Sequence, residues 1–450
     1  MWKLCFKTLK ADDNFKRLLR NGLSLLSANT VVSLLQFSQV IVLTRFLLPE
    51  GYGIFTLVVV YVEIINEFFD MRVELMTVQF GSKYLSRKDS SGVVAIIKLS
   101  YIVDSLTGIL AFIVVLLTVP WATHIVFQNA ILEPLIRLYT ICLLFGTLKG
   151  TNDSVLRILN YFTWISVYAV TVATVEFLSV TIALALGKGV KGVLMSLIYL
   201  EVLRLCSSTA LAFAALQRRF FGWSLLRNAP IGSLKGQFGE IGKFLLHTNV
   251  FGYIRMINTQ IDVLILGHFR PASELGMYRF ARGLANVVVR ITDPFAAAIL
   301  PDLGRLWATS RIREYQALLR KSFVSMVVVL VPLAVVLSAM SKILCRFLAG
   351  NAYVQAAPSF IVCLGAFTIG AIFFWAWPAA ISMQRADYGT WVGIVGCILQ
   401  VILALALVPR IGGMGTAIAL LSTYVVGQPL LAWLTQKQVQ NRKCQLEYAL

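Results

Sequence analysis

Apolar stretches of about twenty residues recur along the chain, and each is bounded by charged residues or by glycine and proline. A stretch of this length can cross the hydrocarbon core of a bilayer as one helix. Twelve such helices are predicted in two sets of six: 23–43, 53–72, 93–119, 131–148, 162–186 and 190–215, then 244–267, 275–300, 322–345, 355–382, 389–409 and 414–434. The pattern therefore predicts an all-α polytopic membrane protein.

The composition supports a membrane location and leaves two explanations for the charge. The 450 residues are 58% hydrophobic and 14% charged, with a mean hydropathy of +0.79, whereas soluble domains are about 45–50% apolar and about 25% charged. A total of 40 Lys and Arg against 21 Asp and Glu gives a formal charge of +19. This charge is typical of proteins that bind anionic lipid headgroups or nucleic acid. The positions of the charges decide between the two.

The Lys and Arg residues outside the predicted helices lie mostly on one side of the membrane. If the N-terminus is cytoplasmic, the inner segments hold about 26 of them and the outer loops about seven. This asymmetry predicts a multi-pass protein of the cell inner (cytoplasmic) membrane with both termini cytoplasmic. Because topology accounts for most of the charge, we expect membrane lipids as partners and no nucleic acid. The predicted organisation is a basic segment 1–20, a lobe 21–215, a cytoplasmic linker 216–242, a lobe 243–435 and a cytoplasmic tail 436–450.

The two halves of the chain resemble each other. A shift of 223 residues lays Gly53 on Gly276 and Asp70 on Asp293 without a gap. Six helices per half, with both ends on one side, give the halves the same orientation about an axis along the membrane normal. We therefore expect two pseudo-symmetric six-helix lobes around a central cavity.

Three motifs resemble one family of membrane proteins: Thr44-Arg45-Phe46-Leu47-Leu48-Pro49-Glu50-Gly51-Tyr52-Gly53-Ile54-Phe55, Gly276-x-Tyr278-x-x-Ala281-Arg282 and Pro301-Asp302-Leu303-x-Arg305-Leu306. They are similar to motifs of the Wzx-type polysaccharide and O-antigen flippases, which belong to the MOP superfamily with the MATE and MurJ transporters. The resemblance covers about residues 16–435. One departure is the second-half counterpart of the first motif, which reads Ala272-Ser273-Glu274-Leu275-Gly276.

The resemblance implies a function and partners. Members of the family move a polyprenyl-diphosphate-linked oligosaccharide from the inner to the outer leaflet, for synthesis of surface polysaccharides such as the lipopolysaccharide O-antigen. It implies this lipid-linked oligosaccharide as the substrate. It also makes polysaccharide polymerase and chain-length machinery candidate partners.

Charged residues inside the predicted helices of the second half indicate an anionic ligand. On an ideal helix 275–300, four of them share a face within about 80°: Arg279, Arg282, Arg290 and Asp293. Helix 244–267 adds Arg255 and Asp262, seven residues apart on one face. An arginine at the bilayer centre costs about 2.5–3.5 kcal/mol, and its guanidinium binds phosphate oxygens in pairs. We therefore predict that Arg282 and Arg290 bind the diphosphate and that Arg255 and Arg279 assist.

Acidic residues in the first half suggest gating and ion coupling. Four carboxylates share one face of the predicted helix 53–72 and its continuation: Glu63, Glu67, Asp70 and Glu74. The repeat sets Glu67 against Arg290, which predicts a gate between them, with Asp70, Asp262 and Asp293 as ion-coupling residues. The alternative is that the charges inside the helices are static ion pairs. Static pairing is the preferred interpretation for Asp104, Glu176, Glu201 and Arg204.

Two other functions stay open from the residues alone. A MATE-like ion-coupled exporter of small organic molecules would need carboxylates as its main ligands. A membrane glycosyltransferase or polymerase would need acid and base residues in a large outer loop, whereas the predicted outer loops are short. The three histidines have no metal-ligand spacing, so the sequence predicts no metal site. For a transporter, no catalytic residue and no cofactor are predicted. Gly187-Lys188-Gly189-Val190-Lys191-Gly192 has the wrong spacing for a phosphate-binding loop, which argues against direct use of ATP.

Overall fold

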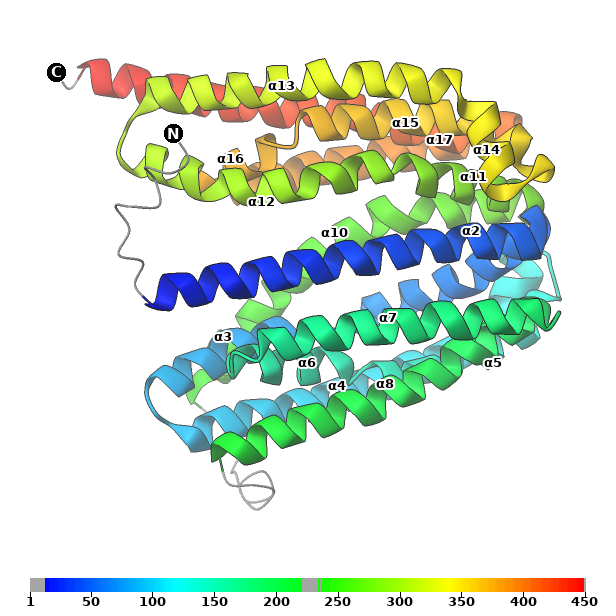
Figure 1. The fold of residues 1–450 in the computed structure, drawn as a ribbon, viewed down its shortest axis with the longest axis horizontal. Coiled ribbons are helices and arrows are strands. Elements are labelled where there is room, and N and C mark those ends of the chain that lie inside the picture. The colour runs from blue at the N-terminus through cyan, green and yellow to red at the C-terminus, as the bar shows by residue number, and fades with distance from the viewer. Residues whose placement is uncertain (1–12, 221–233, 235, 449–450) are drawn as a thin grey trace. The chain divides into compact units, whose positions relative to one another are not determined.

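The computed structural model describes residues 13–220, 234 and 236–448, and this part of the chain contains helices and no strand (Figure 1). Residues 1–12 of the predicted basic segment and most of the predicted linker lie outside the described residues. The first half contains α2 (Asp13–Phe69), α3 (Val73–Ser86), α4 (Ser90–Trp121), the π-helix η1 (Ala122–Val126), α5 (Leu132–Gly146), α6 (Lys149–Ile158), α7 (Phe162–Ala185) and α8 (Gly189–Phe220).

The second half begins with α10 and ends with one very long helix. Its elements are α10 (Phe238–Phe269), α11 (Ala272–Ala285), α12 (Val287–Ala308), α13 (Ile312–Ala339), α14 (Ser341–Ala349), the 3-10 helix η3 (Asn351–Ala356), α15 (Ala357–Ile372), α16 (Ala376–Ser382) and α17 (Ala386–Tyr448). The last predicted helix ends at 434, but α17 continues to Tyr448, so most of the predicted tail is helical.

Two helices are too long to cross a membrane once. Helix α2 has 57 residues and α17 has 63, whereas about twenty residues span a hydrocarbon core of about 30 Å. Each contains a residue with non-helical backbone: Leu48 (φ 58°, ψ 175°), which precedes Pro49, and Gly412 (φ 56°, ψ −132°). The chain therefore turns sharply at both points.

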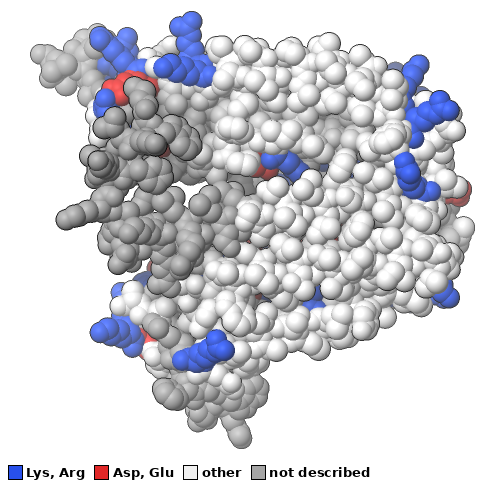
Figure 2. All heavy atoms as spheres, in the orientation of Figure 1, with Lys and Arg blue, Asp and Glu red and all other residues white. Residues whose placement is uncertain are grey.

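The number of membrane crossings agrees with the sequence pattern. Eight stretches of the described chain are long and apolar enough to cross a membrane, and two of these have 60 residues each. Division of these two at Leu48 and Gly412, together with the α5–α6 segment and α10, gives about twelve crossings. The predicted all-α, multi-pass fold is confirmed. On the face that Figure 2 shows, Lys and Arg side chains gather near the helix ends, and the surface between them is almost uncharged, as expected beside lipid tails.

The chain forms two compact units. Unit 1 comprises the described residues of Met1–Val40, Phe68–Leu117 and Arg137–Asn249, and unit 2 comprises Ile41–Glu67, Thr118–Ile136 and Val250–Leu450. Every change from one unit to the other falls inside a helix. This division differs from the lobes expected from the repeat, because unit 2 includes two segments of the first half. The lobes stay a prediction.

In unit 1, the short helix α6 packs against α3, α7 and α8. Its buried side includes Asn152, whose Nδ2 donates to Ser208 Oγ (2.8 Å) and whose Oδ1 accepts from Tyr101 Oη (2.5 Å). Val155 lies in an apolar core that Phe80 and Ile96 share. These contacts hold α6 in a defined rotation about its axis.

In unit 2, the two copies of the repeat meet at their equivalent glycines. A Cβ on Gly53 would lie 1.7 Å from the carbonyl oxygen of Ala272, and a Cβ on Gly276 would lie 2.0 Å from that of Pro49. Pro49 and Ala272 are themselves 223 residues apart. The contact is therefore reciprocal, as in a twofold-symmetric interface, and only glycine fits at its two central positions.

Candidate functional site

The most deeply buried charges of unit 2 form a closed network between α10 and α11. The side chain of Asp262 is 1% exposed and that of Arg282 is 12% exposed. Asp262 Oδ2 accepts hydrogen bonds from Arg282 Nη1 (2.5 Å) and Tyr278 Oη (2.6 Å). Arg282 Nη1 also donates to the carbonyl of Thr259 (2.9 Å). Within the described chain, the Nε and Nη2 atoms of Arg282 donate no hydrogen bond.

Arg279 lies on the same helix in a second, looser cluster. It is half-buried and interacts electrostatically with Tyr52 and Glu63 of α2. Glu63 Oε2 accepts a long hydrogen bond of 3.4 Å from Gln260 Nε2 of α10. Among the described residues, no carboxylate forms a close ion pair with Arg279.

The predicted stripe on one helix 275–300 is divided. One residue with helical backbone angles, Asn286 (φ −65°, ψ −14°), separates α11 from α12 within the single apolar stretch Ala272–Ala308, so Arg282 lies near the end of α11 and Arg290 near the start of α12. Arg290 and Asp293 are exposed on α12 and interact electrostatically. Arg255 is exposed on α10. Neither Arg255 nor Arg290 forms an ion pair with a residue that the structure describes.

The two acids proposed for gating and coupling in the first half lie near a helix break. Glu67 is half-buried close to the end of α2, and Asp70 is exposed in the break between α2 and α3. Asp70 Oδ1 accepts a hydrogen bond from the backbone N–H of Arg72 (2.8 Å), which has a left-handed conformation (φ 49°). Asp70 therefore stabilises the turn. Contact between Glu67 and Arg290 stays a prediction.

In unit 1, Arg204 of α8 is bound by two carboxylates. It forms ion pairs with Glu176 of α7 and with Glu201 one turn away on its own helix. Gln39 Nε2 of α2 also donates to Glu176 Oε1 (3.3 Å). The predicted structural pairing is confirmed for Glu176, Glu201 and Arg204. It is wrong for Asp104, which accepts a hydrogen bond from Thr151 Oγ1 (2.5 Å) and forms no ion pair with a described residue.

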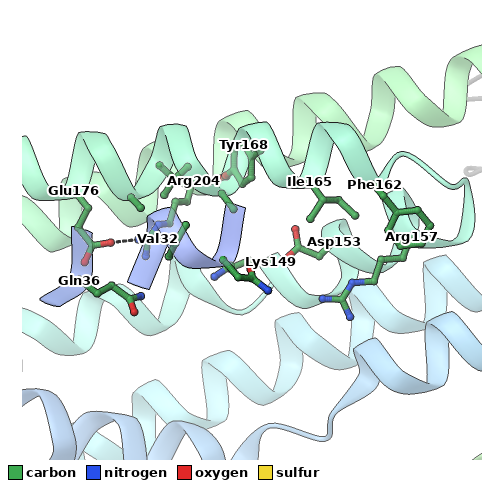
Figure 3. Close-up of a pocket in the computed structure, with 14 residues that line it drawn as sticks. Val32, Gln36, Lys149, Asp153, Arg157, Phe162, Ile165, Tyr168, Glu176 and Arg204 are labelled. Atoms are coloured by element: carbon green, nitrogen blue, oxygen red, sulfur yellow. Dashed lines mark hydrogen bonds and ion pairs between the residues drawn. The ribbon is translucent and has the colours of Figure 1, made fainter. Parts of the chain in front are cut away.

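A cavity of about 510 Å³ opens beside this cluster, between α2, α6, α7 and α8 (Figure 3). Its size falls in the range of about 300–1,000 Å³ that is typical of ligand sites. Lys149, Asp153 and Arg157 line it from α6, and Glu176 and Arg204 line its other end.

The sequence pattern does not identify the three charged residues of α6 as candidate site residues. Helix 131–148 is predicted to end before Lys149, which places Lys149 and Arg157 in a segment between predicted helices. The four-residue spacing of Lys149, Asp153 and Arg157 was the available signal, since such residues share one face of a helix.

The charges inside the helices are thus of two kinds. Arg204 and Arg282 each form ion pairs with carboxylates. Arg255, Arg279 and Arg290 of unit 2, and Lys149 and Arg157 of unit 1, have no close ion-pair partner among the described residues. The cations without a close ion-pair partner have the charge and the hydrogen-bond donors to bind an anion.

Comparison with known proteins gives one family and one fold. The model of a family described as "Polysaccharide biosynthesis protein" matches residues 18–307. Among solved structures, the chain is similar to an inward-facing multidrug resistance MATE family transporter of the MOP superfamily, at 12% identity and a TM-score of 0.70, over 92% of this chain and 95% of that one. It is similar to the lipid II flippase MurJ in an inward closed conformation, at 13% identity and a TM-score of 0.70, over 92% and 87%.

A third similar structure is a mutant of the Vibrio cholerae MATE transporter VcmN, at 12% identity and a TM-score of 0.61, over 95% of this chain and 97% of that one. No curated protein matches the chain significantly in sequence. At these identities the structural similarity shows the fold alone. The resemblance predicted from the three sequence motifs is confirmed.

Proposed function

We propose that this chain, which belongs to the polysaccharide biosynthesis protein family, moves a polyprenyl-diphosphate-linked oligosaccharide from the inner to the outer leaflet of the cytoplasmic membrane by alternating access. The observation that carries the proposal is the presence of three arginines in membrane-spanning helices of unit 2 without an ion-pair partner among the described residues: Arg255, Arg279 and Arg290. Each costs about 2.5–3.5 kcal/mol at the bilayer centre. An anionic ligand offsets this cost.

A diphosphate fits these residues better than a carboxylate or a neutral sugar does. A guanidinium presents its N–H donors in a planar fork that matches two phosphate oxygens, and it stays charged at any ordinary pH. Arg282 joins the set through Nε and Nη2, while Asp262 holds its Nη1 and orients the group. The fold shared with MurJ, a lipid II flippase, supports a lipid-linked cargo.

Acidic residues complete the proposed transport cycle. Glu67 and Arg290 form a gate in one conformational state, and substrate phosphate competes with Glu67 for the guanidinium. Asp70 and Asp293, at equivalent positions of the repeat, carry the coupling ion together with Asp262, which also pairs with Arg282. Polysaccharide polymerase and chain-length machinery are the proposed partners on the product side.

The transport proposal is tested by a leaflet-accessibility assay in proteoliposomes that contain polyprenyl-diphosphate oligosaccharide. Wild type should expose the oligosaccharide to the opposite leaflet, and Arg290→Ala should lose this activity while its membrane abundance stays normal. Arg305→Ala is the matched control, because Arg305 lies on the same helix, is 73% exposed and pairs with Asp302 (3.0 Å). Transport of organic cations by a wild type that does not flip the lipid would favour the MATE-like exporter instead.

The proposed orientation has its own test. Both termini are placed in the cytoplasm, so the exposed residue Ser86 lies inside and the exposed residue Lys188 lies outside. In a background without cysteines, an impermeant maleimide applied to intact cells should label Lys188→Cys and miss Ser86→Cys. The reverse pattern would invert the membrane orientation and with it the direction of transport.

A further inference from the structure

The cavity of unit 1 has a charged side and an apolar side. Helix α6 lines it with Lys149, Asp153 and Arg157, and α7 lines it with Phe162 and Ile165 (Figure 3). Ligand sites of this size are mostly apolar with a few polar groups that fix orientation. A ligand that matches this lining has a charged part and an apolar or ring-bearing part.

The described residues neutralise the positive charge on the α6 side only in part. Lys149 and Arg157 are exposed, and neither forms an ion pair or a side-chain hydrogen bond within the part of the chain that the structure describes. Asp153, four residues from each, interacts electrostatically with both. Two cations and one carboxylate leave one net positive charge on this face of α6.

The other end of the same cavity provides a contrast. Arg204 also lines it, but Glu176 and Glu201 hold this guanidinium in ion pairs. A negatively charged ligand is therefore attracted to the α6 end and finds no available cation at the α8 end.

We infer that this cavity is a second anion site, in which Lys149 and Arg157 bind the phosphate-bearing headgroup of a membrane lipid. Arginine offers two parallel hydrogen bonds to phosphate oxygens, and lysine offers a compact charge on a flexible stem. The apolar lining from α7 accommodates the part of the ligand next to the phosphate. The identification of this headgroup with the diphosphate of the transported lipid rests on the proposed function.

Substitution of Asp153 should change anion affinity in the opposite direction to substitution of Lys149 and Arg157. A carboxylate between two cations repels a bound anion, so removal of its charge strengthens binding, whereas loss of the cations weakens it. A role of these residues in folding alone would not produce opposite effects on anion affinity.

The experiment measures binding to the purified full-length protein by native mass spectrometry in detergent. Three probes are titrated separately: a polyprenyl diphosphate, phosphatidylglycerol and inorganic pyrophosphate. Lys149→Gln/Arg157→Gln should weaken binding of the polyprenyl diphosphate at least tenfold, and Asp153→Asn should strengthen it severalfold. Lys191→Gln/Arg87→Gln removes the same two charge types from exposed positions of unit 1 and should leave binding unchanged.

The three probes separate the sources of the phosphate. Preference for the polyprenyl diphosphate supports a substrate site. Preference for phosphatidylglycerol supports a lipid-headgroup site and overturns the link to the substrate, and preference for pyrophosphate overturns the lipid assignment. Equal affinity of wild type, the double variant and Asp153→Asn for every probe would overturn the anion site itself.

The transport assay distinguishes failure of this inference from failure of the proposed function. If wild type flips the lipid and Lys149→Gln/Arg157→Gln both binds and flips as wild type does, the inference fails and the function stands. If wild type binds the polyprenyl diphosphate through these residues but does not flip it, the function fails and the site stands. Thermal unfolding of each variant near that of wild type shows that the comparison involves folded protein.

Discussion

Arg282 in unit 2 and the pair Lys149 and Arg157 in unit 1 are all cations on helices of a membrane protein, but their surroundings differ. Arg282 shares a buried hydrogen-bond network with Asp262 and Tyr278. Lys149 and Arg157 line a cavity of about 510 Å³ and have no close ion-pair partner among the described residues. The first arrangement stabilises the packing of two helices, and the second leaves charge available for a ligand. An intramembrane charge thus indicates a binding site only when its surroundings leave it both space and unused donors.

The same contrast appears in how closely the helices approach. In unit 2, the repeat-related glycines Gly53 and Gly276 bring backbone against backbone. In unit 1, α6 and α7 leave room between the side chains that line the cavity. Interiors without voids transmit strain, because a small change in volume displaces neighbours. Substitutions should therefore affect the stability of the first region and the ligand binding of the second.

The largest expected effect is that of Arg282→Ala. Removal of one partner of a buried ion pair leaves an uncompensated charge, here on Asp262, at a cost of about 3–5 kcal/mol. We expect strongly reduced membrane abundance and a lower midpoint in thermal unfolding of the detergent-solubilised protein. Arg290→Ala, on an exposed residue of α12, should unfold like wild type. Normal stability of Arg282→Ala would remove the distinction between an arginine in a buried ion pair and the arginines without a close ion-pair partner.

The next effect is that of Gly53→Ala or Gly276→Ala. Each added Cβ would meet a backbone carbonyl at 1.7 or 2.0 Å, and overpacking of this kind costs about 1–3 kcal/mol or more. Gly283→Ala is the matched control on α11, because a Cβ there meets nothing within 4 Å. Thermal unfolding should rank the first two variants clearly below the control, and three equal midpoints would show that the close contact carries no stability.

A smaller effect is expected at Asp89, a carboxylate outside the membrane-spanning helices. Its Oδ1 accepts hydrogen bonds from Gly92 N–H (2.9 Å) and Ser91 Oγ–H (2.8 Å) at the start of α4. These bonds, that of Gly92 first, hold the pKa of Asp89 below its ordinary value of 3.8. The stabilisation is present above pH 3.8 and is lost as the pH falls through the lower pKa of the folded state.

Asp89→Ala should lower stability by about 1 kcal/mol at neutral pH, as expected for loss of a helix N-cap. The deficit relative to wild type should shrink at acid pH, where the wild-type carboxylate is protonated. Asp89→Asn can still cap the helix, so its unfolding midpoint at pH 7 should lie between those of wild type and Asp89→Ala. A deficit that does not change with pH would show that the capping bonds do not depend on the charge.

The smallest effect on stability is expected for the cations of the cavity. Lys149→Gln/Arg157→Gln should change the free energy of unfolding by no more than about 0.5 kcal/mol, because exposed residues without strong partners contribute little. Thermal unfolding of this variant beside Arg282→Ala compares the two regions directly. A large loss of stability would show that Lys149 and Arg157 stabilise the fold, as Arg282 is expected to do.

The sequence determined the crossings because hydropathy is a local property. About twenty apolar residues cross a bilayer wherever they occur, and the sharp turns at Leu48 and Gly412 fall in the gaps between predicted helices. The repeat offset likewise identified Gly53 and Gly276 as equivalent. That these glycines contact each other across the repeat depended on the packing of α2 against α11, which sequence spacing does not contain.

Only the tertiary structure decided which charges are paired. In the sequence, Arg282 and Arg290 follow the same helical spacing, but Asp262, the partner of Arg282, lies twenty residues earlier on another helix. The spacing of Lys149, Asp153 and Arg157 was visible, but the cavity beside them is made by α2, α7 and α8. A helix specifies which side chains share a face, whereas their burial, their partners and the space in front of them are set by the helices that pack around it.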